Sequence, residues 1–230
     1  MPAKKHILLL EDDPNLGFVL QEHLESNGFS VVLKPNGDDG LAETKRSKFA
    51  LMLVDVMMPK KDGFTFAREV RKKDAKTPII FLTAKALKED RIEGFRVGGD
   101  DYVTKPFSIE ELLLRIAAVL KRTAATPLEM SAKKIVLGTI TFDSTNQTLV
   151  HGSKTSRLTS KESELLALLA AHVNAAVDRS EILSTVWGDD TYFNGRSLDV
   201  FISKLRKHLS VDPSVEIKNV HGKGYKLVAR

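Results

Sequence analysis

Short, uniformly apolar runs separated by amphipathic segments make up the first half of the chain. Ile7–Leu10, Leu51–Val54 and Pro78–Leu82 are apolar throughout, as expected of strands that a parallel sheet buries on both faces. Weaker strand patterns occur at Ser30–Leu33 and Asp101–Val103. The alternation of strands and helices predicts an α/β fold, a doubly wound (βα)5 parallel sheet with right-handed crossovers.

The segments between these runs have the spacing of amphipathic helices. Asp13-Pro14 supplies an N-cap and a proline at the first helical position, and Asn27-Gly28 ends the first of these segments. The other helices are expected at about 37–47, 64–71, 89–97 and 108–121.

The pattern changes after Arg122. Residues 123–132 have no periodicity and contain many small side chains, which predicts a linker. Beyond it the sequence predicts strands at 135–137, 139–142 and 148–150, helices at about 160–172, 180–186 and 196–209, and a hairpin of 215–219 and 225–228. Three helices closed by a hairpin are typical of an α+β winged helix. The expected domains are therefore 1–122 and 133–230, joined by the linker 123–132.

Composition and charge narrow the class of protein. The chain is 42% hydrophobic and 28% charged, as in soluble globular proteins. It has no apolar segment long enough for a membrane span and no signal-peptide pattern, so we expect a cytoplasmic protein without a membrane partner. The absence of cysteine excludes disulfides and thiolate chemistry. A net charge of +5 permits an anionic partner without identifying one.

Acidic side chains follow two of the apolar runs. Glu11 and Asp12 come directly after the first strand, and Asp55 ends the central one. Because the carboxyl ends of parallel strands meet at one edge of the sheet, these carboxylates should lie close together and repel one another unless a cation such as Mg²⁺ is bound. Asp55 is then a candidate nucleophile that forms an aspartyl phosphate. Lys105 and Thr83 would offer a charge and a hydroxyl to the phosphoryl oxygens.

Other interpretations of the acidic cluster are weaker. A flavin-phosphate site is disfavoured because Glu11 and Asp12 would repel the phosphate. A phosphatase that works through an aspartyl phosphate needs a second acid two residues after the nucleophile, where Met57 stands. A solvated turn would explain any one acid, but it does not explain their joint placement. We therefore expect no turnover enzyme, only Mg-dependent self-phosphorylation and slow self-dephosphorylation.

These residues resemble the receiver domain of bacterial two-component response regulators. The resemblance is carried by Glu11-Asp12, Asp55, Pro59, Gly63, Thr83-Ala84, Asp100-Asp101-Tyr102 and Lys105-Pro106-Phe107. It implies that Asp55 accepts phosphate from the phosphohistidine of a sensor histidine kinase. The implied Mg²⁺ ligands are Glu11, Asp12, Asp55 and the Met57 carbonyl. It further implies that Lys105 contacts the phosphoryl group, that a cis peptide precedes Pro106, and that Thr83 and Tyr102 form the switch pair.

A polar stripe is expected on the last helix of this domain. Its members, Glu111, Arg115 and Arg122, fall at positions i, i+4 and i+11. A solvated face with weak ion pairs would explain the stripe in a monomer. However, it resembles the dimer face of OmpR/PhoB-type receivers. That resemblance implies three pairs across a two-fold axis: Arg91 with Glu111, Asp101 with Arg115, and Asp100 with Arg122.

The helix expected at 196–209 has a basic outer face. Leu198, Ile202, Leu205 and Leu209 would form its buried stripe, which leaves a face that suits a DNA major groove. The hairpin tip at 221–224 is cationic and contains two glycines. Together with Leu158-Thr159, Glu164, Leu183, Val186-Trp187, Arg196-Ser197, Asp199-Val200, Leu205-Arg206 and Gly222-Lys223-Gly224-Tyr225, these features resemble the winged-helix effector of the OmpR/PhoB subfamily. The expected DNA contacts are Arg196, Ser197, Val200, Phe201, Ser203, Lys204, Arg206, Lys207, Asn219, His221 and Lys223.

Three positions depart from the resemblance, and two of them are Ser203 and Phe201, which stand where basic or polar residues are common in relatives. His221 stands where many relatives carry an arginine, so Lys218 or Lys223 would take over its minor-groove contact. Residues 189–194 resemble the segment that meets RNA polymerase in relatives.

The expected function is a phosphorylation-activated transcription regulator that dimerises through its receiver and binds direct-repeat promoter sites in double-stranded DNA. The alternative is a signalling relay or protein-interaction receiver whose second domain no longer acts on DNA.

Overall fold

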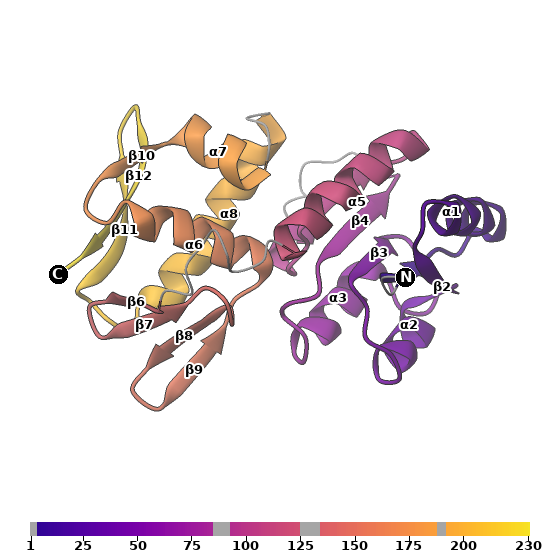
Figure 1. The fold of residues 1–230 in the computed structure, drawn as a ribbon, viewed down its shortest axis with the longest axis horizontal. Helices are drawn as coiled ribbons and strands as arrows, with labels where there is room; N and C mark the ends of the chain where they lie inside the picture. Colours follow the sequence, from indigo (N-terminus) through magenta and orange to yellow (C-terminus); the bar gives the residue numbers. More distant parts are fainter. Residues whose placement is uncertain (1–3, 85–92, 125–133, 188–191) are drawn as a thin grey trace. The chain divides into compact units, whose positions relative to one another are not determined.

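The computed structural model describes residues 4–84, 93–124, 134–187 and 192–230, with the backbone alone for 121–124 and 192–196. The chain divides into two units, Met1–Ala125 and Thr126–Arg230, which we describe separately (Figure 1). The division falls inside the expected linker 123–132. The last helix of the first unit continues to Ala124, two residues into that linker. No helix among the described residues is long and apolar enough to cross a membrane.

A five-stranded parallel sheet forms the centre of the N-terminal unit. Its strands are β1 (His6–Leu10), β2 (Ser30–Lys34), β3 (Leu51–Asp55), β4 (Ile79–Thr83) and β5 (Asp101–Thr104), in the order β2-β1-β3-β4-β5. Every residue of β3 and β4 is buried, which is why these strands read as continuous apolar runs. The predicted sheet is confirmed. The strand order reverses between β1 and β3, the place where α/β sheets of this kind bind their ligands.

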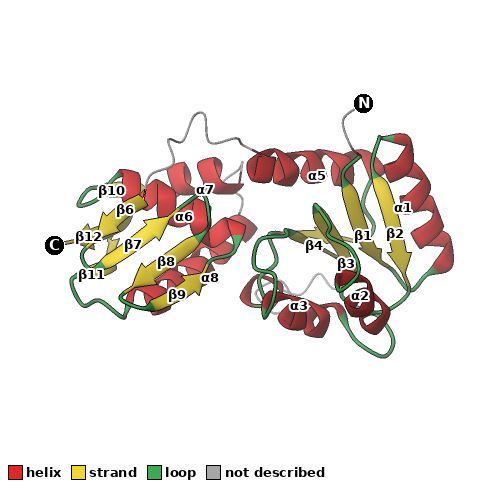
Figure 2. Cartoon of the chain, turned by 60° about the horizontal axis from the view of Figure 1, so that its bottom comes forward, coloured by secondary structure: helices red, strands yellow, loops and turns green. Residues whose placement is uncertain are grey.

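Helices cover both faces of this sheet. Figure 2 shows α1 (Pro14–Ser26) and α5 (Ile109–Ala124) on one face, and α2 (Gly37–Thr44) and α3 (Gly63–Arg71) on the other. The Asp13 carboxylate accepts hydrogen bonds from the first turn of α1, as the N-cap signal predicts. Of the helix expected at 89–97, residues 93–96 are helical and 89–92 lie outside the described residues.

The C-terminal unit contains two antiparallel sheets. The first joins β6 (Lys134–Leu137), β7 (Ile140–Asp143), β8 (Thr148–His151) and β9 (Lys154–Arg157) in that order, and the second has the order β10-β12-β11, from β10 (Ala176–Asp178), β12 (Gly224–Ala229) and β11 (Val215–Val220). The sequence did not predict β9 or β10. All four residues of β9 are exposed and β10 has three residues, so neither strand carries a hydrophobic alternation.

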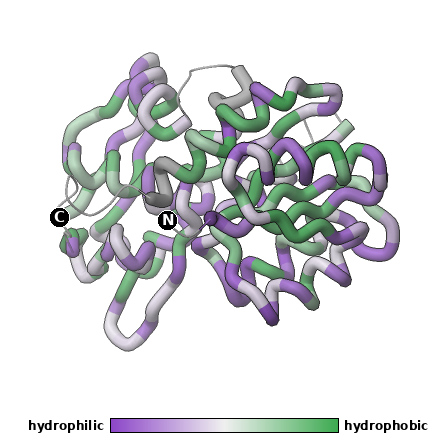
Figure 3. Tube along the Cα trace, turned by 45° about the vertical axis from the view of Figure 1, so that its right-hand side comes forward, coloured by the Kyte–Doolittle hydropathy of each residue, from purple (hydrophilic) through white to green (hydrophobic). Residues whose placement is uncertain are grey.

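Three helices complete the winged-helix arrangement. They are α6 (Ser160–Ala171), α7 (Arg179–Trp187) and α8 (Tyr192–Leu209). A reciprocal capping box between Thr159 and Glu162 fixes the start of α6. Figure 3 shows that hydrophobic and hydrophilic stretches alternate along the chain.

Asp212 joins the first sheet of the C-terminal unit to its hairpin. Its carboxylate accepts hydrogen bonds from the backbone N–H groups of Thr139 (2.6 Å) and Ser214 (2.8 Å) and from both hydroxyls. Gly138 makes room for this contact, because a Cβ there would lie 2.6 Å from the Asp212 carboxylate. These four donors, the Thr139 hydroxyl first among them, hold the pKa of the Asp212 carboxyl well below its ordinary value.

Replacing Asp212 by asparagine should therefore make the unfolding of this unit less pH-dependent. A carboxyl whose pKa is lower in the folded state stabilises the fold above its unfolded pKa of about 3.9, and that stabilisation is lost as the pH falls further. At pH 7 we expect the variant to unfold about 5 °C below wild type, and the difference should shrink below pH 4. Trp187 is the only tryptophan, so its fluorescence follows this unit.

The exposed Asp178→Asn serves as the control for the loss of a charge. A gap between wild type and Asp212→Asn that stays constant from pH 7 to pH 3 would contradict the assignment.

Candidate functional site

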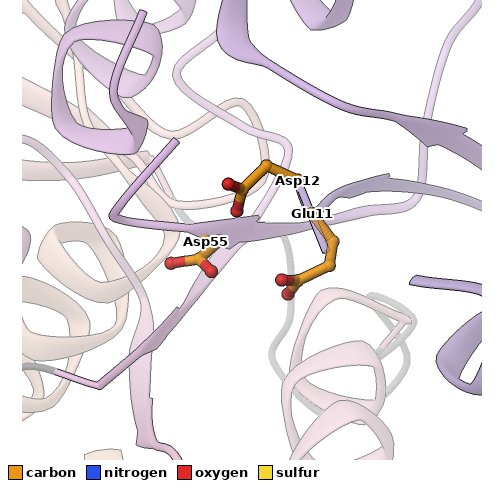
Figure 4. Close-up of side chains that lie close together, drawn as sticks. All are labelled: Glu11, Asp12 and Asp55. Carbon is orange, nitrogen blue, oxygen red and sulfur yellow. The ribbon is translucent and has the colours of Figure 1, made fainter. Parts of the chain in front are cut away.

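Three carboxylates meet at the carboxyl edge of the N-terminal sheet. Glu11 and Asp12 follow β1 and Asp55 ends β3, and one oxygen from each lies within 4.8 Å of the others. Figure 4 shows the three side chains on these two neighbouring strand ends. Glu11 and Asp55 are buried, at 3% and 5% exposure, whereas Asp12 is exposed. The predicted acidic cluster therefore forms, and its all-oxygen donor set fits a hard cation such as Mg²⁺.

Lys105, which follows β5, links two of these acids. Its Nζ lies 2.6 Å from Asp55 Oδ2 and 2.7 Å from Glu11 Oε2. Burial raises the pKa of the Glu11 carboxyl, Asp55 adds to the rise, and the hydrogen bond from Lys105 opposes it. Burial alone would lower the pKa of the Lys105 ammonium, but its bonds to Asp55 and Glu11 outweigh this and raise it. The ammonium is therefore held as a fixed positive charge against Asp55.

The turn after β3 holds the Asp55 side chain in place. The Met57 N–H donates to Asp55 Oδ1 at 2.8 Å, and the Gly63 N–H donates to the Val56 carbonyl at 3.0 Å. A Cβ at Gly63 would lie 2.2 Å from the Asp55 carbonyl oxygen, so the start of α3 approaches this strand as closely as only glycine allows. The Met57 carbonyl remains a predicted metal ligand.

Two further residues predicted at this edge lie on β4 and β5. Thr83 is the last residue of β4 and its carbonyl accepts from the Lys105 N–H at 2.7 Å. The peptide bond between Lys105 and Pro106 is cis, as the resemblance implied. Tyr102 is buried, at 2% exposure, with its ring centroid 6.3 Å from that of Phe81. Its ring therefore points into the domain in this structure.

Helix α8 carries the second predicted site. Leu198, Ile202, Leu205 and Leu209 are all buried, which confirms the predicted inner stripe. On the outer side, Ser203, Arg206 and Lys207 are exposed and Val200 is partly exposed. The Lys204 ammonium lies 3.3 Å from a carboxylate oxygen of the buried Glu162.

Two residues of α8 that were predicted as DNA contacts are buried. Phe201 has 0% exposure and its ring centroid lies 5.6 Å from that of Trp187, and Ser197 has 1% exposure. Their side chains are therefore corrected from DNA contacts to core positions. The physical reason is that α6 and α7 both pack on α8, so its buried stripe is wider than one helical row. Arg196 lies outside the residues whose side chains are described.

Arg206 and the hairpin residues complete this surface. Arg206 Nε donates to the Ile217 carbonyl at 2.9 Å and its Nη2 donates to Asn219 Oδ1 at 2.7 Å, contacts that the sequence pattern did not predict. His221 and Lys223 are exposed at the hairpin tip. Gly222 between them has a φ of +68°, a backbone conformation that glycine adopts without the strain that a residue with a side chain would incur.

Comparison with known proteins decides the family. Residues 7–117 match the family described as "Response regulator receiver domain", and residues 153–227 match "Transcriptional regulatory protein, C terminal". The chain is 55% identical over 229 residues to the transcriptional regulatory protein RprY of Bacteroides fragilis, which covers 99% of this chain and 96% of RprY. It also aligns with the structure of DrrB of Thermotoga maritima, an OmpR/PhoB homologue, at 31% identity and a TM-score of 0.50, over 99% of this chain and 100% of DrrB. The chain is an OmpR/PhoB-type response regulator.

Two other comparisons agree with this assignment. YkoG of Bacillus subtilis, an uncharacterised transcriptional regulatory protein, is 37% identical over 223 residues, which are 96% of this chain and 97% of YkoG. A structure of a RitR mutant has a TM-score of 0.81 at 27% identity and covers 97% of this chain and 98% of its own. This response regulator is thus a phosphorylation-dependent, DNA-binding transcription regulator. Receiver domains of this family use Mg²⁺ and have histidine kinases as partners.

The predicted dimer residues of this response regulator fall into three groups. Arg115 Nη1 lies 3.2 Å from Asp101 Oδ2 and its Nε lies 3.0 Å from Glu111 Oε1, so these three residues form one cluster on β5 and α5. Burial alone would lower the pKa of Arg115, but Asp101 and Glu111 raise it. Arg91 and the side chain of Arg122 lie outside the described residues.

Asp100 differs from the prediction. It was expected to pair across the dimer with Arg122, but its carboxylate is 3% exposed. It accepts from the Ile79 N–H at 2.9 Å and lies 3.2 Å from Arg71 Nη2. A buried acid that is already paired is costly to expose, so in this conformation Asp100 joins β4 to α3 and is not available at the surface.

Proposed function

We propose that Asp55 is the phosphoacceptor of this response regulator and that a phosphohistidine of a sensor histidine kinase is the donor. The observation that carries the proposal is the position of Lys105, whose ammonium is bonded to Asp55 and Glu11 at the carboxyl edge of the sheet. An Asp55 carboxylate oxygen would attack the phosphorus, the bond from phosphorus to the histidine nitrogen would break, and the imidazole would leave. Lys105 would stabilise the charge on the phosphoryl oxygens.

Glu11, Asp12, Asp55 and the Met57 carbonyl would hold the Mg²⁺. When bound, the ion supplies positive charge to the transferring phosphoryl group. Lys105, whose ammonium is bonded to Asp55 and Glu11, would supply a second positive charge. Burial of Glu11 and Asp55 excludes water from their side of the site, which strengthens both interactions.

The switch in this proposal begins at Thr83. Its hydroxyl would donate a hydrogen bond to an oxygen of the phosphoryl group, which is absent before phosphorylation. Thr83 and Tyr102 lie on the neighbouring strands β4 and β5, where Tyr102 is the register partner of Phe81, so a shift at Thr83 would reach Tyr102 through this pair of strands. Phosphorylation would thereby select one arrangement of the face formed by β5 and α5.

The phosphorylated receivers would then form a dimer. Asp101, Glu111 and Arg115 already pair within one chain. A two-fold axis would place the acids of one chain opposite the cations of the other, so each ion pair would form twice across the interface. Two tethered winged helices would next bind direct-repeat half-sites about one DNA turn apart. The candidate contacts that remain are Val200, Ser203, Lys204, Arg206, Lys207, Asn219, His221 and Lys223, with Arg196, and the segment 189–194 for RNA polymerase.

The test of this function follows one sample through three measurements. The full chain is incubated with Mg²⁺ and acetyl phosphate, and its intact mass, oligomeric state and binding to a random-sequence duplex library are measured. One added phosphate per chain, formation of a dimer and enrichment of particular duplexes would support the proposal. A phosphorylated chain that enriches no duplex would instead favour a signalling relay.

Replacing Arg115 by alanine should separate dimerisation from phosphorylation. The guanidinium contacts both acids of the proposed interface, and its removal takes away the cation that Asp101 and Glu111 share. We expect phosphate incorporation at the wild-type level and a dimer dissociation constant raised about tenfold or more. Sedimentation of the phosphorylated chain measures this.

The matched control is Lys72→Ala, which removes an exposed cation next to α3. If Arg115→Ala dimerises as readily as this control, the face formed by β5 and α5 is not the interface.

A further inference from the structure

Three side chains from different elements of the winged helix meet at one point. Arg179 is the first residue of α7, Asp199 lies in α8, and Tyr225 lies in β12. Asp199 Oδ1 accepts from Arg179 Nη1 at 2.9 Å and from the Tyr225 hydroxyl at 2.8 Å, and Arg179 Nη1 lies 3.1 Å from that hydroxyl. We call these three residues the helix–hairpin brace. They connect the helix with the basic outer face to a strand of the hairpin.

The backbone supports the same connection. The Arg179 N–H donates to the Lys223 carbonyl at 3.0 Å. A Cβ at Gly224 would lie 2.2 Å from the Val177 carbonyl oxygen and 2.8 Å from the Arg179 nitrogen. The beginning of β12 therefore lies directly against the junction of β10 and α7, which brings the Tyr225 ring to the position where its hydroxyl meets Asp199.

A separate contact ties α8 to the other strand of the hairpin. Arg206, seven residues after Asp199, donates to the Ile217 carbonyl and to Asn219 on β11. The two contacts are about two helical turns apart, because 3.6 residues make one turn. Each half of α8 is thus held to a different strand of the hairpin.

The chemistry of the brace favours a geometric role. Burial raises the pKa of the Tyr225 hydroxyl and the Asp199 carboxylate raises it further, so the hydroxyl stays protonated and donates. The Arg179 and Asp199 side chains are 39% and 44% exposed, and ion pairs this exposed contribute little to stability. The brace instead fixes how α7, α8 and β12 are oriented relative to one another, since each of its bonds joins two of these elements.

We propose that Arg179, Asp199 and Tyr225 are positioning residues that set the distance and angle between α8 and the hairpin tip. Their effect on DNA binding rests on the proposed contacts of α8 and the hairpin, which would then reach adjacent grooves as one body. The positioning itself is a property of the free protein. Such a brace orders α8 and the hairpin relative to each other in the free protein. The entropic cost of ordering them is therefore not incurred when DNA binds.

The first experiment measures the positioning without DNA. The chain contains no cysteine, so Lys207→Cys and Lys223→Cys, both at exposed positions, introduce the only two thiols for spin labels. In the full chain we expect one narrow distance distribution. It should broaden in Tyr225→Phe and in Asp199→Ala, whereas Asp199→Asn, which keeps an acceptor oxygen, should remain narrow. Lys226→Gln, on β12 but outside the brace, is the matched control.

The second experiment measures the consequence on DNA. The probe is one duplex selected by the wild-type chain from a random-sequence library. We expect Tyr225→Phe to bind it about fivefold more weakly, and Lys223→Ala to weaken binding in wild type but hardly at all in Tyr225→Phe. Affinity losses smaller than the product of the two single losses show that the hairpin contact depends on the brace.

Each outcome decides the proposal. Distance distributions of Tyr225→Phe and Asp199→Ala that superimpose on wild type overturn it. A broadened distribution with fully multiplicative affinity losses overturns the claim that α8 and the hairpin bind as one body. If wild type selects no duplex, the proposed DNA contacts fail, and the distance measurement alone decides the positioning.

Discussion

Replacing Asp55 by asparagine is expected to reduce phosphoryl incorporation from one group per chain to none. The amide cannot act as the oxygen nucleophile, and it removes one of the three carboxylates that lie within 4.8 Å of one another. The Lys105 ammonium also loses the negative charge of the carboxylate 2.6 Å away. Intact mass after incubation with Mg²⁺ and acetyl phosphate measures the result, and dimer formation should be lost with the phosphate.

Asp38→Asn is the control for this variant. Asp38 is an exposed acid of α2 whose carboxylate lies 3.3 Å from the Lys61 ammonium, away from the acidic cluster, so incorporation should match wild type. A phosphate that still appears on Asp55→Asn would mean that another side chain accepts it, and the proposed function would then lose its central residue.

Replacing Gly63 by alanine is expected to destabilise the receiver by about 3 kcal/mol or more. The added methyl group would lie 2.2 Å from the Asp55 carbonyl oxygen and 2.9 Å from Val54 Cγ1, and the nearer of these is backbone, which cannot turn aside. Because Asp55 itself must move, phosphorylation should also slow. Circular dichroism of the full chain should show an early transition, while Trp187 fluorescence reports an unchanged C-terminal unit.

Gly17→Ala is the matched control. Gly17 lies inside α1, and its added methyl would meet the Leu33 methyl groups at 3.1 and 3.2 Å, which can shift, and Glu11 Cγ at an ordinary contact distance of 3.6 Å. Alanine also gains up to about 1 kcal/mol of helix propensity over glycine, so we expect a change near zero. Equal stability of the two variants would show that the turn between β3 and α3 is looser than its geometry indicates.

Most of the N-terminal fold could be predicted because its strands carry a strong signal. Leu51–Asp55 and Ile79–Thr83 are buried on both faces of the sheet. Such strands have apolar side chains at nearly every position, which makes them recognisable in the sequence. Lys154–Arg157 leaves no such mark, since all of its residues are exposed. Its position depends on pairing with β8, which is a tertiary contact.

The acidic cluster could also be predicted from a strong strand pattern. Parts of the proposed DNA-binding face of α8 could not. Strand ends converge wherever the sheet is parallel, so Glu11 and Asp55 were placed together by topology alone. Helical periodicity, in contrast, gives the direction of a buried stripe but not its width. Phe201 is buried because two helices pack on α8, and Asp100 because Arg71 reaches it from α3. Neither partner is near in sequence.

Strand β9, at one edge of the first C-terminal sheet, bears on how copies of the chain avoid aggregation. β9 stands at the end of the order β6-β7-β8-β9, and an edge strand is a template on which a foreign chain can add itself. A dimer would double the number of such edges in a small volume. Lys154 and Arg157 stand at its two ends, and their like charges on both copies would repel an approaching edge. The charges of these two residues would thereby oppose edge-to-edge aggregation.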